Sequence, residues 1–217
     1  YKEMQQYQMD QLTPQLQRRL LELAGVTPLD GACARCGLEL SSDAPPRRRL
    51  ERLVTPQGVS FELLEGVPEN RPRLERMVIL QGGQRLEITS MVQDGLSVQP
   101  FRFGAQQESA LALGFDRPGT GTLRLWFQVD PPAGVPRNPA DDSTPPPRTL
   151  AWKMEGAGRV EPVSDGTWCL SWSGYVTLPV PQGWQAGEDG LYWLELRLER
   201  AGCEEQPRLS GLSAGRV

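Results

Sequence analysis

The chain has 217 residues, and its 23 lysines and arginines against 27 aspartates and glutamates give a formal net charge of −4 at pH 7. This mild acidity argues against a dedicated nucleic-acid binder or a binder of anionic membranes, because both carry a basic surface. Histidine is absent, which excludes Ser-His-Asp and Cys-His catalysis and histidine ligation of zinc or haem.

Targeting signals are also missing from the sequence given. No apolar run approaches the roughly 18 to 20 residues that a membrane-spanning helix needs, and the polar start YKEMQQYQMDQ lacks the apolar core of a signal peptide. We therefore expect a cytoplasmic protein without a membrane span. The sequence does not begin with Met and ends at AGRV, which leaves open whether it is a segment of a longer chain.

The first segment, residues 1–31, is expected to be helical. Thr13 is a plausible N-cap, Pro14 suits the first helical position, and Gly25 suits the end of a helix over residues 13–24. Leucines recur there every three or four residues, which indicates an amphipathic helix. We expect its apolar stripe to cover one end of a β core; the alternative is that it packs on another chain. The stripe consists of Leu12, Leu16, Leu20 and Leu23.

Cys33 and Cys36 form a C-x-x-C pair in GACARCG. A closed zinc site needs four nitrogen or sulfur ligands, and neither a second C-x-x-C nor a histidine is present to complete it. A redox site would place the pair at the start of a helix after a strand, and the surrounding residues do not follow that pattern. We expect four reduced thiols, no metal and no cofactor, and leave the role of Cys33 and Cys36 open.

From residue 32 the hydrophobic period changes to two, which predicts a small β domain over residues 32–100. Its dense basic cluster contains Arg47, Arg48 and Arg49. We expect these arginines to line a solvated strand edge, where charge resists unwanted pairing. The alternative is a docking patch for an acidic partner, which makes the three arginines candidate interface residues.

Residues 101–217 are expected to form a β-sandwich that contains all six tryptophans. In Leu123–Val129, every second residue is apolar, which predicts a half-buried strand with Trp126 on the outer face. A proline-rich loop is expected at 131–148, since seven of the 17 residues from Pro131 to Pro147 are proline. The later short runs, separated by turn residues about every ten positions, predict an antiparallel arrangement.

Five of the six tryptophans fall into two predicted groups. WCLSW is expected to be a strand with Trp168 and Trp172 on one face, and these two, with Trp152, are expected in the core. Trp126 and Trp193 lie opposite the aliphatic faces of their strands, so we predict that they point outward and are candidate interface residues, because large aromatic side chains anchor protein–protein interfaces. Exposed tryptophans on a β-sandwich also stack on sugar rings, which leaves carbohydrate binding open.

Catalysis is not expected. The sequence contains no nucleophile elbow, phosphate-binding loop or usable dinucleotide fingerprint. Asp116, Asp165 and Asp189 each lie beside Gly or Pro, or in a turn-like context, and resemble turn formers. We therefore predict that the protein is not an enzyme.

A series of motifs after residue 110 resembles one family. ALALGFDRP is followed by TLRLWFQV, a variable loop, LAWKMEGAG, SDGTWCLSWSGYVTLPVP, GLYWLELRLE and QPRLSGL. This succession resembles the baseplate-assembly (wedge) proteins of contractile phage tails and related contractile injection systems, specifically over residues 110–209 and more loosely from residue 12. The matching positions include Gly114, Phe115, Asp116, Trp152, Asp165, Thr167, Ser173, Gly174, Tyr192, Trp193 and Arg197.

The resemblance implies a structural role. Such proteins are arranged in several copies around a sixfold axis, and they contact a second wedge protein, the hub or spike, and the sheath or tube initiator. The expected fold is therefore mainly β, with antiparallel β-sandwich modules preceded by a short amphipathic helix, and the expected function is that of a baseplate wedge component in a phage-tail-like particle. The alternative is a carbohydrate- or receptor-binding β-sandwich module.

Overall fold

The computed structural model describes residues 45–64, 66–67, 71–101, 109–130, 145–200 and 206–214, which all belong to the compact unit Gly37–Val217. The helix expected at 13–24, Cys33, Cys36 and most of the proline-rich loop lie outside the described residues. Among the described residues, no helix is long and apolar enough to cross a membrane.

The described secondary structure is almost entirely β. Its elements are β1 (Arg52–Val54), β2 (Ser60–Glu62), β3 (Leu74–Gln81), β4 (Gln84–Glu87), α3 (Thr89–Gln93), β5 (Ser109–Phe115), β6 (Thr122–Asp130), β7 (Thr149–Met154), β8 (Gly158–Val160), β9 (Ser164–Asp165), β10 (Gly174–Pro179), β11 (Tyr192–Arg200) and β12 (Arg208–Ser213).

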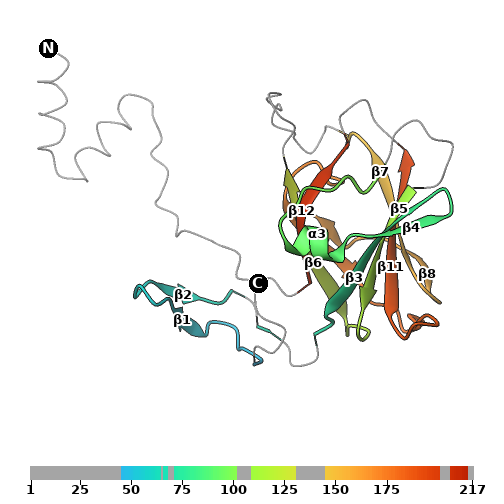
Figure 1. Ribbon diagram of the computed structural model, residues 1–217. Helices are drawn as coiled ribbons and strands as arrows, with labels where there is room; N and C mark the ends of the chain where they lie inside the picture. Colours follow the sequence, from blue (N-terminus) through green and yellow to red (C-terminus); the bar gives the residue numbers. More distant parts are fainter. Residues whose placement is uncertain are drawn as a thin grey trace, which may run out of the picture. The chain divides into compact units, whose positions relative to one another are not determined.

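Two antiparallel sheets form a β-sandwich, which confirms the predicted fold class (Figure 1). One sheet has six strands in the order β4-β3-β5-β11-β7-β8, and the other has four in the order β12-β6-β10-β9. The inward side chains of both sheets belong to one apolar core. Trp152 of β7 contacts Phe127 of β6 edge to face, with ring centroids 6.0 Å apart, and so joins the two layers.

The core extends across the domain boundary predicted near residue 100. β3 pairs with β5 from Leu74 to Gln81, and α3 packs against both β3 and β12 (Figure 1). Met77, Ile79 and Val92 are buried in the same core as residues of β5–β12. Residues 71–100 are therefore part of the sandwich, because β3 is the strand that pairs with one side of β5. The predicted boundary near residue 100 does not separate two cores.

The predicted arginine cluster lies just before a separate two-stranded sheet and not on one of its strands. β1 pairs with β2, and backbone hydrogen bonds extend this hairpin to Arg47 and Val67. Arg47 forms an ion pair with Glu51, four residues away, whereas Arg48 and Arg49 are exposed.

Strand β6 follows the predicted alternation. Leu123, Leu125, Phe127 and Val129 are buried, whereas Arg124 and Trp126 are half-buried on the outer face. The prediction of a strand at WCLSW is wrong. Trp168, Cys169 and Leu170 have φ angles of 51°, 55° and 59°, so the chain makes a left-handed turn between β9 and β10.

Candidate interaction surface

Strand β5, one of the two central strands of the six-stranded sheet, carries only small residues on the outer face of that sheet. Ala110, Ala112 and Gly114 of β5 point away from the core, opposite Arg197, Glu195 and Trp193 of β11. On the other side, Val78 and Leu80 of β3 pair with Ala112 and Ala110. Because the outward side chains of β5 are small, the larger side chains of β3 and β11 cover them. Every residue of β5 is buried.

This arrangement leaves a hollow of about 690 Å³, called the outer groove below. Its walls come from β3, β4 and β11, and one end is formed by the turn 187–190 together with Glu155, which follows β7. Val78, Leu80, Ala112 and Trp193 supply its apolar surface. Its volume lies within the range of about 300–1,000 Å³ common for binding pockets.

Trp193 is held in one orientation in the outer groove. A Cβ on its cross-strand partner Gly114 would lie 3.0 Å from the indole Cη2 atom, a tight contact that would require the ring to shift, so glycine leaves the ring its full space. The indole N–H donates a hydrogen bond to Asp189 Oδ1 at 3.0 Å, and the Arg85 guanidinium lies 5.6 Å from the ring centroid. Fixed aromatic side chains of this kind lose little conformational entropy when they bind a partner.

Charged side chains surround the indole. Arg76 lies 3.3 Å from Glu87 and 3.7 Å from Asp189, and Arg197 donates a hydrogen bond to Glu195 at 2.7 Å. Partial burial of Asp189 opposes its ionisation, but hydrogen bonds from Trp193 and the Leu191 backbone, with the Arg76 charge, outweigh this effect and lower its pKa. Asp189 is therefore an anion at neutral pH.

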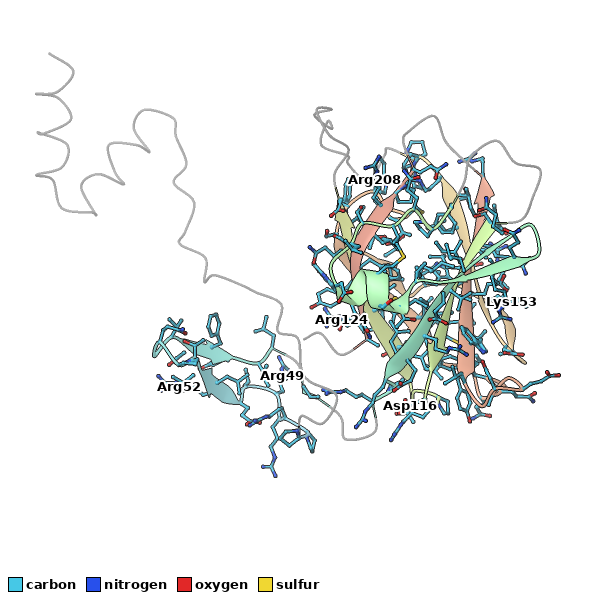
Figure 2. The ribbon with its side chains drawn as sticks, viewed as in Figure 1. Arg49, Arg52, Asp116, Arg124, Lys153 and Arg208 are labelled. Carbon is cyan, nitrogen blue, oxygen red and sulfur yellow. The ribbon has the colours of Figure 1, made fainter. Side chains whose placement is uncertain are left out.

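The other candidate tryptophan lies on the opposite side of the sandwich. Trp126 packs edge to face on Tyr175 at 4.7 Å, and Arg124 lies 3.9 Å above the Tyr175 ring. Figure 2 labels one residue of each sheet: Arg124 lies on β6, the strand of Trp126, and Lys153 lies on β7, in the sheet that contains Trp193. The structure therefore does not bring Trp126 and Trp193 together. The interface roles of both remain predictions, as do those of Arg47, Arg48 and Arg49.

Several motif positions hold the sandwich together. Phe115 is fully buried and contacts Trp184, with ring centroids 5.8 Å apart; its cross-strand partner Tyr192 also contacts Trp184 at 5.8 Å. Asp116 accepts a hydrogen bond from the Arg73 backbone N–H at 2.8 Å, just before β3. These residues stabilise the fold around Gly114 and Trp193.

Two further motif positions fix the start of β10, next to the left-handed turn that follows β9. The Ser173 hydroxyl contacts both the backbone N–H and the carbonyl of Val129, at 2.9 and 3.2 Å. A Cβ at position 174 would lie 2.3 Å from the Gly166 carbonyl oxygen. Gly174 thus permits a backbone approach that no side chain allows.

The left-handed turn is a feature that the sequence reasoning missed. Asp165 accepts hydrogen bonds from the backbone N–H and hydroxyl of Thr167 and from the Cys169 N–H. The buried Arg148 guanidinium donates to the carbonyls of Cys169 and Leu170 at 3.0 and 2.9 Å. The Asp-x-Thr spacing was the available signal, since such pairs form local side-chain–backbone turns.

This turn presents two tryptophans differently from the prediction. Trp168 and Trp172 stack with centroids 5.0 Å apart and an interplanar angle of 13°. Trp168 is half-buried and Trp172 is 38% exposed. Neither belongs to the apolar core, so the prediction that both are core residues is wrong, whereas Trp152 is buried as predicted. Burial, followed by the nearby Asp165 charge, raises the pKa of the Cys169 thiol to about 11. That thiol is therefore neutral at pH 7.

Comparison of the sequence with protein-family models and with curated proteins finds no match. The function is therefore inferred from the residues and the structure.

Proposed function

We propose that this chain is a structural wedge component of the baseplate of a phage-tail-like contractile injection system. In this proposal it assembles in the cytoplasm, in several copies around a sixfold axis, and links the hub or spike to the tube and sheath. Its partners are other baseplate proteins. The role is mechanical: its surfaces hold neighbouring proteins before firing and change partners when the sheath contracts.

One observation carries the proposal. Gly114 and Trp193 belong to different motifs of the family resemblance, 79 positions apart in the sequence, and they are cross-strand partners on an outer sheet face. Gly114 provides the space in which the indole lies, and Asp189 fixes its N–H. A fixed, partly exposed tryptophan inside a polar rim is typical of the residues that contribute most to protein–protein binding.

The test is electron microscopy of the native organism with and without the gene. We expect intact contractile particles in the wild type, and free tubes or sheaths, or no particles, after deletion. Complementation with the unaltered gene restores the particles, whereas Trp193→Ala restores few. Trp172→Ala, an exposed tryptophan away from the outer groove, serves as the matched control and restores them fully. Intact particles after deletion, or no particles in the wild type, would overturn the proposal.

A second candidate function is a carbohydrate- or receptor-binding module. The stacked Trp168 and Trp172 pair favours it, because exposed indole faces bind the apolar faces of sugar rings. Glycan-array binding by the purified chain that is lost in Trp172→Ala and retained in Trp193→Ala would support this function. Absence of glycan binding by the unaltered chain would exclude the carbohydrate form of it.

A further inference from the structure

We infer that the outer groove binds an arginine-bearing segment of a partner protein. This inference rests on the proposed function, since it specifies the chemistry of the partner that docks on the six-stranded sheet. Three properties of the groove support it: its charge, the way it already holds guanidinium groups, and its apolar floor.

The charge of the groove is complementary to a basic segment. Five carboxylates line it, from Glu87, Glu155, Glu188, Asp189 and Glu195, against the two guanidinium groups of Arg76 and Arg85. Within the described part of the chain, Glu155 and Glu188 form no ion pair. The negative charge is therefore only partly compensated at the end of the groove formed by the turn 187–190.

At this end of the outer groove, the carboxylates of Glu155 and Asp189 border the same space beside Gly187. A Cβ on Gly187 would lie 3.0 Å from Glu155 Oε2, 3.3 Å from Asp189 Oδ1 and 3.1 Å from Trp193 Cδ1. Two carboxylates and the indole thus border the same small space, which glycine leaves open. Lys153 opposes Glu195 across β7 and β11 but does not line the groove, and Arg197 is bound to Glu195, so neither neutralises this end.

The chain's own arginines show how the groove accommodates a guanidinium group. Arg76 lies between Glu87 and Asp189, and Arg85 lies over the Trp193 ring. Both are modes that favour arginine over lysine, because a planar guanidinium bonds carboxylates with several N–H groups and stacks on aromatic faces. We expect an incoming guanidinium near Glu155 and Glu188 to use the same modes.

The floor of the groove suits the aliphatic part of such a side chain. Val78, Leu80 and Ala112 lie beneath the charged rim; Val78 and Ala112 are only 4% exposed, so the half-buried Leu80 and Trp193 supply most of the accessible apolar surface. Arginine buries its methylene stem on apolar surface while its charged end reaches polar groups. The combination of floor and rim therefore selects a basic side chain over a purely apolar or an acidic one.

The experiment measures fluorescence anisotropy of labelled peptides with the purified full chain. The probes are Gly-Arg-Ala-Arg-Gly and its lysine and glutamine counterparts. We expect the arginine peptide to bind at least tenfold more tightly than the glutamine peptide and more tightly than the lysine peptide, with affinity falling as NaCl rises from 50 to 300 mM. Equal binding of the arginine and glutamine peptides, or of the arginine and lysine peptides, would overturn the inference.

Matched variants test the location. Glu155→Gln with Glu188→Gln should weaken binding of the arginine peptide at least tenfold. Glu161→Gln with Glu199→Gln changes the net charge equally at the Arg159 ion pairs on the other edge of the sheet, and should leave binding unchanged. Equal weakening in both double variants would mean general electrostatic attraction and would overturn the inference; unfolding midpoints of all variants verify that they are folded.

The two proposals fail separately. Loss of particles on gene deletion, combined with no arginine-peptide binding, would overturn the inference and leave the wedge function standing. Arginine-peptide binding at Glu155 and Glu188, combined with intact particles after deletion, would support the groove chemistry and overturn the baseplate role of its partner.

Discussion

At the scale of single residues, Gly174 leaves almost no room for a Cβ. Its Cβ would lie 2.3 Å from a backbone oxygen of Gly166, which cannot move without disturbing the pairing of β10. We expect Gly174→Ala to lower the free energy of unfolding by about 1–3 kcal/mol, the usual cost of overpacking, as measured by urea denaturation. Gly183→Ala is the control, because a Cβ there meets no atom closer than 3.8 Å. Equal stability of both variants would contradict the expectation.

Asp189 gives a pH dependence at the same scale. Its pKa in the folded protein is lowered below the ordinary value of 3.8, because the bonds from Trp193 and Leu191 and the Arg76 charge outweigh burial. A lowered pKa means that the carboxylate stabilises the fold above pH 3.8, and that this contribution is lost as the pH falls through the lowered value. The stability difference between the unaltered chain and Asp189→Asn should therefore be constant near neutral pH and shrink below pH 3.8. A difference that persists unchanged in acid would contradict this assignment.

At the scale of elements, the left-handed turn depends on side chains that compensate for its backbone. Left-handed residues other than glycine cost about 1–2 kcal/mol each, and three occur in succession. Asp165→Ala removes three hydrogen bonds, so we expect a loss of about 2–3 kcal/mol and a change in the near-ultraviolet circular dichroism of the Trp168–Trp172 stack. Asp94→Ala, at the end of α3, should alter neither. An unchanged tryptophan signal in Asp165→Ala would show that Arg148 and Thr167 maintain the turn without Asp165.

The same turn shows where prediction from the sequence ends. The alternation of β6 was predictable because its apolar residues face the core and both of its edges pair with strands of the same sheet. The alternation of WCLSW was misleading, because Asp165, Thr167 and the distant Arg148 favour another backbone. For the outer groove, the outward position of Trp193 followed from its strand pattern. Its place above Gly114 depended on the β5–β11 register, which no local pattern specifies.

At the scale of the whole molecule, β3, β4 and α3 complete the sandwich. A fragment of residues 101–217 lacks the strand that pairs with β5 and the helix that contacts β3 and β12. We expect this fragment to aggregate, because it exposes an unpaired strand and apolar core. A fragment of residues 71–217 retains all strands of both sheets and should give a cooperative unfolding transition. Cooperative unfolding of the shorter fragment would contradict this account of the core.

The end of β6 and the start of β7, which flank the proline-rich segment, indicate where a label can be inserted in the protein. β6 ends in one sheet and β7 begins in the other, and Ser173 and Arg148 bond the chain at these two points to the same turn. These hydrogen bonds involve no residue of the segment between Val129 and Arg148, so they do not depend on its length. Because the cost of closing a loop grows only with the logarithm of its length, doubling the number of residues between two anchors costs only about 0.6 kcal/mol. A guest sequence such as an epitope or a fluorescent tag, inserted between residues 137 and 138, would mark every copy of the protein and leave both sheets and the outer groove intact.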